Sequence, residues 1–490
     1  MSGKNYAAFD FGAESGRAII GTVENDRLSL KEIHRFPNKQ LTIDGHIHWD
    51  AQYQFNEIKT GLRKMAKSGM DIQSIAIDTW GVDFGLLDVQ GNLIENPYAY
   101  RDSRTDGMMD KVFERIPRRD VYNRTGIQFM QLNSLYQLYS MLGSPALEEA
   151  DRLLFMPDLF NYMLCGEKVC EYTIASTSQM LNANDRKWDG ELFDILGLPL
   201  RIMPSVVEPA TIIGKLSPDI QSAIGMTTTD VIAVGSHDTA SAVAAVPMSG
   251  KNCAYLSSGT WSLLGIESAE PIISDESYRF NFTNEGGVNK NYRFLKNTMG
   301  LWLLQQSRKS WQRQGEYYDY ADLVQMAERA EPFYAVVNPD DASFLNPADM
   351  PQAIAAFCKK TGQSVPQEPG QFSRIILESL ALKYRYIIEK INGMIKQPIE
   401  ALHIVGGGSQ NELLNQFTAN ALGIPVISGP VEATAIGNIL VQLLAKGVIG
   451  SLEEGRAVVK NSFEQKEYLS QETKHWNDVF MNVKKWLKTN

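Results

Sequence analysis

One order of elements occurs twice in this chain and limits its fold more than any other feature. In the first occurrence, two apolar strands flank a turn that contains two glycines, and a third strand, an amphipathic helix and a buried strand follow. The predicted segments are, in order, strand 6–11, turn 12–16, strand 17–23, strand 28–36, helix 55–69 and strand 74–80. This pattern predicts an antiparallel meander that continues into an α/β crossover.

The second occurrence begins at residues 251–268, where a Ser-, Gly- and Thr-rich turn again separates two apolar strands. Residues 375–392 form a strong helical pattern, and residues 401–429 read as strand, glycine-rich turn, helix and strand. A chain of 490 residues also exceeds the roughly 250–300 residues that one hydrophobic core serves. We therefore expect two analogous lobes, residues 1–246 and 247–490, joined where Pro and Gly interrupt the segment 246–251.

Charge and composition narrow the class of partner. The formal net charge is −10 and no Lys/Arg run is dense enough to override it, so nucleic acid is not an expected partner. The N-terminus lacks a basic segment leading into an apolar stretch, and no run of about 18 apolar residues occurs. These features predict a cytoplasmic protein with no membrane partner and with its four cysteines reduced. The oligomeric state, monomer or homodimer, stays open.

Three glycine-bearing turns are candidate phosphate-binding elements. The chain has neither a P-loop motif nor a strand-linked G-x-G-x-x-G, but backbone N–H groups of tight turns also bind phosphate. The turns are Asp10–Arg17, Ser257–Thr260 and Gly406–Ser409, and the third leads into a predicted helix N-terminus. Each also has a purely structural interpretation, as a hairpin or a short strand–helix loop. Asp10 ends a buried strand, where a carboxylate suits a hydrated Mg²⁺.

A candidate general base follows another buried strand. In residues 231–246, His237, Asp238 and Thr239 lie between an apolar strand and an Ala-rich helix. A carboxylate there can accept the proton of an alcohol that attacks phosphorus. Asp238 or Thr239 can equally act as a helix N-cap and nothing more.

The segment 74–88 offers polar groups and an aromatic ring for a small sugar. Asp78, Trp80, Gly81 and Asp83 follow a buried strand. Trp80 can pack against an apolar sugar face or simply belong to the core. His46 and His48, two residues apart in GHIHWD, lack further ligands and form a weak candidate metal site.

These motifs resemble the FGGY family of carbohydrate kinases, from Asp10 to about Gly447. The likeness rests on DFGAESGR, IDTWGVDF, AYRDSRT, GSHDTASAV, AYLSSGTWSL, LKNTMGLWLLQ and IVGGGSQN, and three of these motifs resemble the rhamnulose branch. The resemblance implies a two-lobed, actin-like ATPase (ribonuclease H-like) α/β fold, each lobe a mixed sheet with flanking helices. It also implies ATP-dependent phosphorylation of L-rhamnulose at its C1 hydroxyl, with Mg²⁺.

The resemblance also implies roles for individual residues. Asp238 would be the proton acceptor. The sugar would contact Gly81, His237, Asp238, Thr239 and Asn297, and ATP would contact Ala13, Glu14, Ser15, Gly16, Arg17, Thr260, Gln305 and Gly407. Asn297 and Gln305 carry no signal of their own, because LKNTMGLWLLQ otherwise reads as the start of an amphipathic helix. Glu14 departs from the family, in which a small hydroxyl residue often stands here, and a carboxylate beside triphosphate is unfavourable unless it points away.

Two alternatives differ in activity. A kinase for fuculose or xylulose needs only different residues around Trp80 and Asp83. A non-catalytic actin-like ATPase would hydrolyse ATP without sugar dependence, and its Asp238 would matter little.

Overall fold

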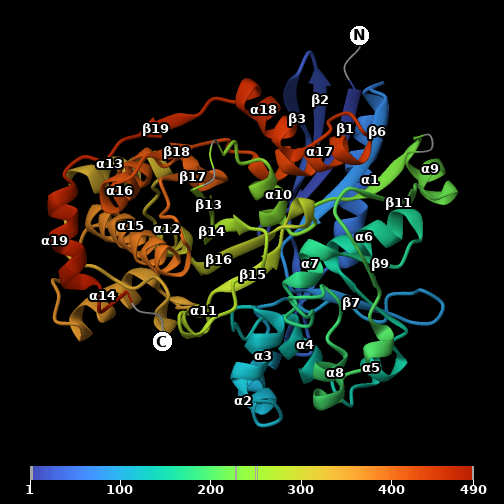
Figure 1. Ribbon diagram of the computed structural model, residues 1–490, viewed down its shortest axis with the longest axis horizontal. Helices are drawn as coiled ribbons and strands as arrows, with labels where there is room; N and C mark the ends of the chain where they lie inside the picture. Colours follow the sequence, from blue (N-terminus) through green and yellow to red (C-terminus); the bar gives the residue numbers. More distant parts are fainter. Residues whose placement is uncertain (1–3, 227–228, 249, 251, 488–490) are drawn as a thin grey trace. The chain divides into compact units, whose positions relative to one another are not determined.

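The computed structural model describes residues 4–226, 229–248, 250 and 252–487 (Figure 1). Its chain divides into two compact units. Unit 1 comprises Met1–Pro247, Glu267–Phe294 and Ala433–Ser462, and unit 2 comprises Met248–Ile266, Leu295–Glu432 and Phe463–Asn490. The predicted lobe boundary between 246 and 247 stays a prediction, and Ser249 and Lys251 of the expected joining segment lie outside the described residues.

A six-stranded sheet forms the centre of unit 1, in the order β11-β12-β6-β1-β2-β3. Its strands are β1 (Lys4–Phe11), β2 (Ser15–Glu24), β3 (Arg27–Pro37), β6 (Ile72–Thr79), β11 (Thr211–Lys215) and β12 (Asp230–Ala233). Strands β1, β2 and β3 form the predicted antiparallel meander. Strand β6 pairs in parallel with β1 and with β12, so the carboxyl ends of three strands meet at one edge.

Helices cover both faces of this sheet. Phe9 points to the face where α1 (Ala51–Lys67) and α6 (Met156–Cys165) supply apolar side chains, and Ala76 points to the opposite core. That opposite face carries α10 (Asp238–Ala244), α17 (Ala433–Ala445) and α18 (Leu452–Ser462). Helix α17, drawn in orange-red, lies along the blue strands β1 and β6 although some 350 residues or more of sequence separate them (Figure 1).

Smaller elements complete unit 1. Its short strand pairs are β4 (Gln40–Ile43) with β5 (His46–Trp49), β7 (Phe84–Leu87) with β8 (Arg152–Phe155), and β9 (Val169–Glu171) with β10 (Ser205–Val207). Its other helices are α2 (Met108–Phe113), α3 (Arg118–Thr125), α4 (Ser134–Ser140), α5 (Pro145–Glu149), α7 (Tyr172–Ser176), α8 (Gly190–Leu196), α9 (Pro218–Ile224) and α11 (Asp275–Arg279).

The second sheet repeats the order of the first. Its seven strands run β15-β16-β14-β13-β17-β18-β19, and they are β13 (Cys253–Ser258), β14 (Trp261–Ser268), β15 (Thr283–Gly286), β16 (Tyr292–Met299), β17 (Ala401–Val405), β18 (Val426–Ser428) and β19 (Lys466–Tyr468). As with β1, strand β13 pairs antiparallel with the strand after its turn and in parallel with the strand on its other side. The sequence-based inference of two analogous halves is confirmed at the level of sheet topology.

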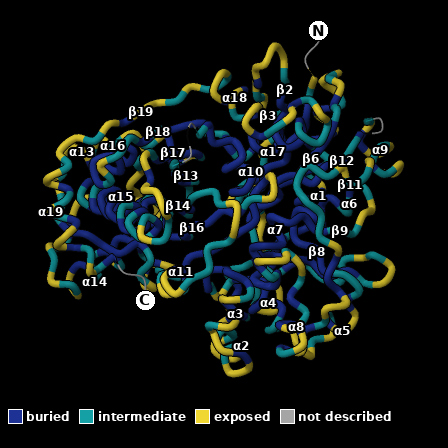
Figure 2. Tube along the Cα trace, in the orientation of Figure 1, coloured by how far each residue is buried: buried dark blue, intermediate teal, exposed yellow. Residues whose placement is uncertain are grey.

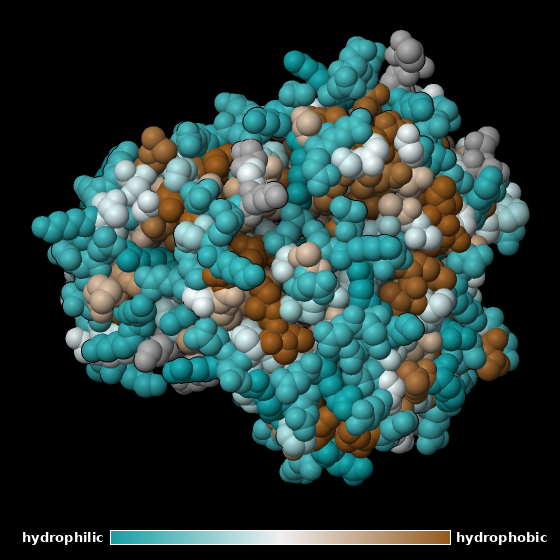
Figure 3. Space-filling view, in the orientation of Figure 1, coloured by the Kyte–Doolittle hydropathy of each residue, from teal (hydrophilic) through white to brown (hydrophobic). Residues whose placement is uncertain are grey.

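Strand β15 and the first residues of β16 belong to unit 1, and apart from its strands of the second sheet unit 2 is helical. Its helices are α12 (Trp302–Arg313), α13 (Tyr320–Arg329), α14 (Met350–Lys360), α15 (Pro369–Met394), α16 (Glu412–Leu422) and α19 (Thr473–Val483). The segment LKNTMGLWLLQ differs from the sequence-based interpretation, because Lys296–Met299 continue strand β16 and the helix begins only at Trp302. Buried residues follow the central strands in Figure 2, while the face in Figure 3 is mostly hydrophilic with separate apolar patches. The apolar side chains therefore lie largely inside each unit.

The described part of the chain contains no helix that combines the length and apolar character needed to cross a membrane. The four cysteines, Cys165, Cys170, Cys253 and Cys358, are thiols, and none of them forms a disulfide.

Candidate functional site

Asn38 braces the turn between β1 and β2 from outside. Asn38 donates its side-chain Nδ2 to the carbonyl of Gly12 and its backbone N–H to the carbonyl of Glu14, both at 2.9 Å. Gly16 packs so closely that an added Cβ would lie 2.3 Å from the ring of Phe36. The predicted nucleotide residues Ala13–Arg17 therefore form a tight, braced loop. The side chain of Glu14 is exposed there, which is compatible with its pointing away from a bound anion.

Two carboxylates lie side by side at the carboxyl end of the sheet. Asp10 on β1 and Asp78 on β6 are direct partners in the parallel register. Arg17 forms a short ion pair with Asp10, and Asn438 on α17 donates its side-chain Nδ2 to Oδ2 of Asp78 at 2.6 Å. Burial raises the pKa of Asp78 well above its usual value, and the nearby charges of Asp10 and Asp238 raise it further. The three carboxylates therefore share one electrostatic environment.

The candidate base lies on the next parallel strand along this edge. Strand β12 ends at Ala233, and the backbone N–H of Thr79 donates to the carbonyl of Ser236 at 2.9 Å, which fixes the turn against β6. Helix α10 begins at Asp238 and its N-cap is His237, without a side-chain capping bond. Asp238 is therefore the first residue of the helix, as one alternative held, but the N-cap position belongs to His237 and not to Asp238 or Thr239.

The environment of the Asp238 carboxylate suits a base. It accepts a hydrogen bond from Oγ1 of Thr239 at 3.0 Å and keeps 32% of its side-chain surface exposed. Burial by the surrounding protein raises its pKa, the neighbouring His237 lowers it, and the negative charge of Asp10 raises it. A carboxylate with a raised pKa is a better proton acceptor than one with the usual value.

A buried glutamate holds this turn from behind. Glu171 accepts hydrogen bonds from the backbone N–H of Ser236 at 3.1 Å and from Oγ1 of Thr173 at 2.6 Å. Thr173 Oγ1 in turn accepts the backbone N–H of His237 at 3.2 Å. Burial raises the pKa of Glu171 to about 7 despite these donors. The backbone that presents Asp238 is thus fixed by two side chains from β9 and α7.

The loop after β6 is strained and braced. Val82 has a φ of +70°, which a β-branched residue rarely adopts. Its backbone N–H donates to Oγ1 of Thr177 at 3.2 Å, and its carbonyl accepts from Oγ of Ser134 at 2.6 Å. An added Cβ at Gly81 would lie 3.2 Å from Thr177. The predicted sugar residue Gly81 therefore lies in a loop whose shape is imposed by neighbouring helices.

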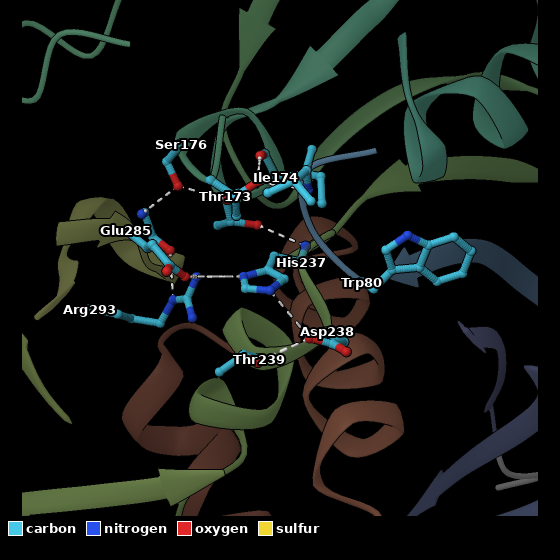
Figure 4. Close-up of polar contacts among 12 residues, drawn as sticks. Trp80, Thr173, Ile174, Ser176, His237, Asp238, Thr239, Glu285 and Arg293 are labelled. Atoms are coloured by element: carbon cyan, nitrogen blue, oxygen red, sulfur yellow. Dashed lines mark hydrogen bonds and ion pairs between the residues drawn. The ribbon is translucent and has the colours of Figure 1, made fainter. Parts of the chain in front are cut away.

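Trp80 is mainly a core residue. Only 6% of it is exposed, its ring centroid lies 4.3 Å from that of Trp49, and Nε1 of each indole donates to Oδ2 of Asp83. In Figure 4 its ring lies apart from the polar cluster around His237. The core-packing alternative is therefore favoured over a platform for the sugar.

The predicted nucleotide residues of unit 2 cluster around the β13–β14 turn. Oγ1 of Thr260 donates to Oε1 of Gln305 at 3.1 Å. Gly408 approaches the strand end so closely that an added Cβ would lie 2.1 Å from Oγ of Ser258, and Gly406 has a φ of +83°. Gly407–Gln410 form a 3₁₀ turn before α16, so the glycine-rich loop does not lead directly into the α-helix. Asn297, on β16, also belongs to unit 2.

Sequence reasoning missed the residues that brace the site. Asn38, Glu171, Arg293 and Asn438 each contact it from a distant segment, and none carries a local motif. Polar residues inside a mostly apolar helix, such as Asn438 and Gln442 on α17, are a signal that could have identified a partner of the site. His46 instead pairs with Asp102, and His48 contacts the carbonyl of Asn96. No cluster of three or more metal-ligating side chains occurs among the residues that the structure describes.

The doubled sheet and its turns define the class of protein. A gluconate kinase from Lactobacillus acidophilus superposes with a TM-score of 0.81 at 16% identity, covering 99% of this chain and 97% of that one. A glycerol kinase from Plasmodium falciparum, with ADP, superposes with a TM-score of 0.79 at 14% identity, covering 100% and 99%. The predicted actin-like ATPase fold, with two α/β units, is thereby confirmed.

Sequence comparisons give the family. Models for the N-terminal and C-terminal domains of the FGGY family of carbohydrate kinases match residues 5–245 and 254–446. The chain belongs to the FGGY family of carbohydrate kinases. It is 48% identical over 483 residues to a rhamnulokinase of Bacteroides thetaiotaomicron, covering 98% of this chain and 99% of that protein. A rhamnulokinase of Pectobacterium atrosepticum is 44% identical, covering 96% and 93%.

Proposed function

We propose that this protein transfers the γ-phosphoryl group of ATP to the C1 hydroxyl of L-rhamnulose, giving L-rhamnulose 1-phosphate and ADP. The observation that carries the proposal is the likeness, at 40–48% identity over 94–98% of the chain, to seven curated relatives, each of them a rhamnulokinase. The partly exposed carboxylate of Asp238, at the carboxyl edge of three parallel strands, supports the same chemistry. A cytoplasmic location and the oligomeric state stay predictions.

Asp238 acts as the proton acceptor in this proposal. As the sugar oxygen bonds to phosphorus, the bond between the γ-phosphorus and the bridging oxygen breaks, and the hydroxyl proton passes to the carboxylate. Glu171 and Thr173 hold the turn, so that Asp238 is already oriented when the sugar binds. Gly81, His237, Thr239 and Asn297 are proposed to contact the sugar.

The nucleotide is proposed to contact the glycine-bearing turns described above and residues beside them. In unit 1 these are Ala13–Arg17, and in unit 2 they are Thr260, Gln305 and Gly407. Small residues and open backbone N–H groups are what close approach to phosphate oxygens requires. Glu14 is proposed to contact the nucleotide through its backbone N–H, because its side chain is exposed.

Asp10 and Asp78 fit a magnesium ion. Oδ1 of Asp78 is buried and has no hydrogen-bond partner in the described part of the protein, and it belongs to a carboxylate whose strand partner is Asp10. Mg²⁺ usually keeps several waters and takes one or two carboxylates plus phosphate oxygens, so it needs no larger cluster of protein ligands. When bound with ATP, the ion would neutralise charge on the phosphate oxygens.

Release of ADP tests the proposal. The native protein is assayed with L-rhamnulose, L-fuculose and D-xylulose, and turnover is expected with L-rhamnulose above the other two. Asp238→Asn is expected to lower kcat by about 10²–10⁴-fold, the usual contribution of a general base. Asp230→Asn is the matched control. Asp230 begins the strand that leads to Asp238, and its carboxylate pairs with Nζ of Lys446 at 2.6 Å.

Three results would contradict the proposal. Preferred turnover of L-fuculose or D-xylulose would make the protein a kinase for another ketose. ATP hydrolysis that no sugar stimulates would favour the non-catalytic ATPase. An Asp238→Asn variant as active as Asp230→Asn would remove Asp238 from the proton transfer.

A further inference from the structure

A wholly buried arginine lies against His237, the histidine proposed to contact the sugar. Arg293 on β16 has no exposed surface, and its guanidinium donates to three acceptors in unit 1. Figure 4 shows the guanidinium between His237 and Glu285. Nε donates to the carbonyl of Gly286 at 2.8 Å. Nη2 donates to Oε2 of Glu285 at 3.1 Å and to Nδ1 of His237 at 3.0 Å. A buried charge with this many fixed partners defines the position of each of them.

The chemistry of arginine decides the protonation of the imidazole. A guanidinium has only donors and does not lose its proton in proteins. The contact of 3.0 Å between two nitrogens therefore requires Nδ1 of His237 to be the acceptor. Neutral histidine carries one ring proton, which must then be on Nε2.

The other ring nitrogen faces the candidate base. Nε2 of His237 lies 3.4 Å from Oδ1 of Asp238. Oε2 of Glu285 also approaches Nδ1, at 3.3 Å, but it accepts an N–H from the same Nη2 that donates to the ring. Glu285 thus orients the guanidinium, and the guanidinium orients the ring.

We propose that Arg293 is a positioning residue that holds His237 in the tautomer with its proton on Nε2. The proposal rests on the proposed phosphoryl transfer, and it assigns a task to each member of the His237–Asp238 pair. His237 is a fixed N–H donor toward the Asp238 carboxylate or toward a sugar hydroxyl. It has no free lone pair on that side.

This assignment fixes the destination of the proton. When the O–H bond of the sugar breaks and its oxygen bonds to phosphorus, Nε2 of His237 cannot take the proton because it already carries one. The proton passes to a carboxylate oxygen of Asp238, and ADP leaves with the electrons of the broken P–O bond. The opposite arrangement, in which histidine is the base and aspartate orients it, would need a bare Nε2.

Nitrogen NMR reads the tautomer directly, without turnover. The chain has six histidines, so the protein is labelled with ¹⁵N-histidine and the His237 signals are identified by their loss in His237→Gln. Long-range ¹H–¹⁵N correlation is expected to show a bare Nδ1 and a protonated Nε2 at His237. A protonated Nδ1 in the native protein would overturn the proposal, whatever any variant does.

Variants connect the tautomer to turnover. Arg293→Met removes the donor to Nδ1, so the ring is expected to take up the other tautomer, with Nδ1–H toward Glu285, at least in part. We expect kcat to fall by roughly 10–100-fold, as when an outer partner of a functional histidine is lost. Arg293→Lys keeps the positive charge and one donor group but not the planar fork of the guanidinium. The fall in kcat should therefore be smaller in Arg293→Lys than in Arg293→Met. An Arg293→Met or Arg293→Lys protein with unchanged tautomer and kcat contradicts the proposal.

Arg456 supplies the matched control. It is also a largely buried arginine of unit 1, and it donates to Oε2 of Glu267 at 2.8 Å and to the carbonyl of Val243 at 3.1 Å. Arg456→Met is expected to lose stability but to keep the His237 tautomer and the native kcat. Equal changes in both methionine variants would mean a general loss of packing and would refute the specific role. If no ketose is phosphorylated, the proposed function is wrong. The NMR experiment still tests the tautomer of His237, because it does not depend on turnover.

Discussion

Replacing Gly437 with alanine is expected to move the helix that carries the candidate base. Gly437 on α17 faces the backbone of α10, where an added Cβ would lie 1.7 Å from the carbonyl oxygen of Ser241 and 2.5 Å from its carbonyl carbon. Both partners are backbone atoms, so no side-chain rotation can relieve the overlap. Asp238 lies three residues before Ser241 on the same short helix.

The required displacement follows from these distances. An ordinary contact begins near 3.4 Å and the available distance is 1.7 Å, so α10 and α17 must separate by about 1.7 Å. Overpacking of this kind costs about 1–3 kcal/mol of the free energy of unfolding. A misplacement of about 1 Å at a reacting group can lower turnover by roughly 10²-fold. We therefore expect kcat to fall by at least that factor.

ADP release with L-rhamnulose and urea denaturation measure the two effects. Gly393→Ala is the control, because Gly393 is also helical, on α15, and nothing lies within 4 Å of its added Cβ. That variant should keep the native kcat and gain up to about 1 kcal/mol in the free energy of unfolding. A Gly437→Ala protein with native kcat and native stability would refute the argument that this close approach positions Asp238.

Two further predictions concern the nucleotide turn and the buried glutamate. Gly408→Ala would place a Cβ 2.1 Å from Oγ of Ser258, so it should raise the KM for ATP more than it changes the KM for the sugar, and equal changes in both would contradict this. The pKa of Glu171 is raised to about 7 from 4.5. The folded protein therefore binds that proton more tightly, and the stabilisation is lost as the pH rises from about 4.5 through 7, by up to about 1.4 kcal/mol per pH unit. Urea denaturation from pH 5 to 7.5 measures this as the slope of the free energy of unfolding against pH, which should be flatter in Glu171→Gln than in the native protein. Equal slopes in the two proteins would exclude Glu171 as the group with the raised pKa.

The sequence predicted the repeated elements well because their signals are local. Residues 6–11 and 17–23 alternate or run apolar around a glycine turn, and the same holds for the strands on either side of Gly259, so strand pairing followed from neighbours in the chain. The turn from β12 to α10 was also found, since a buried strand followed by an Ala-rich stretch has few other structures. In such segments local pattern and tertiary structure agree.

The sequence-based predictions that were wrong or missing concern residues whose structure depends on contacts with distant segments. Tyr292–Met299 are almost all buried, so they lack the alternation that identifies a strand, and the helical pattern after Trp302 extended the predicted helix too far forward. The residues that contact the site from distant segments could not be predicted for the same reason. Nothing near Arg293 in the sequence indicates His237, which lies 56 residues earlier, and Asn438 lies 360 residues from Asp78.

The late return of α17 and α18 to unit 1 affects how the chain is made. Until Asn438 and Gln442 have been synthesised, Asp78 lacks the amide that donates to it. The hydroxyl of Ser74 lacks its acceptor, Oε1 of Gln442, and the carbonyl of Ala7 lacks its donor, Nε2 of Gln442. One face of the first sheet also stays open to solvent. Unit 1 therefore cannot finish folding on the ribosome in the order of its sequence. It must wait for nearly the whole polypeptide, with unit 2 emerging in between, and during that interval its uncovered apolar strands are a natural target for chaperones.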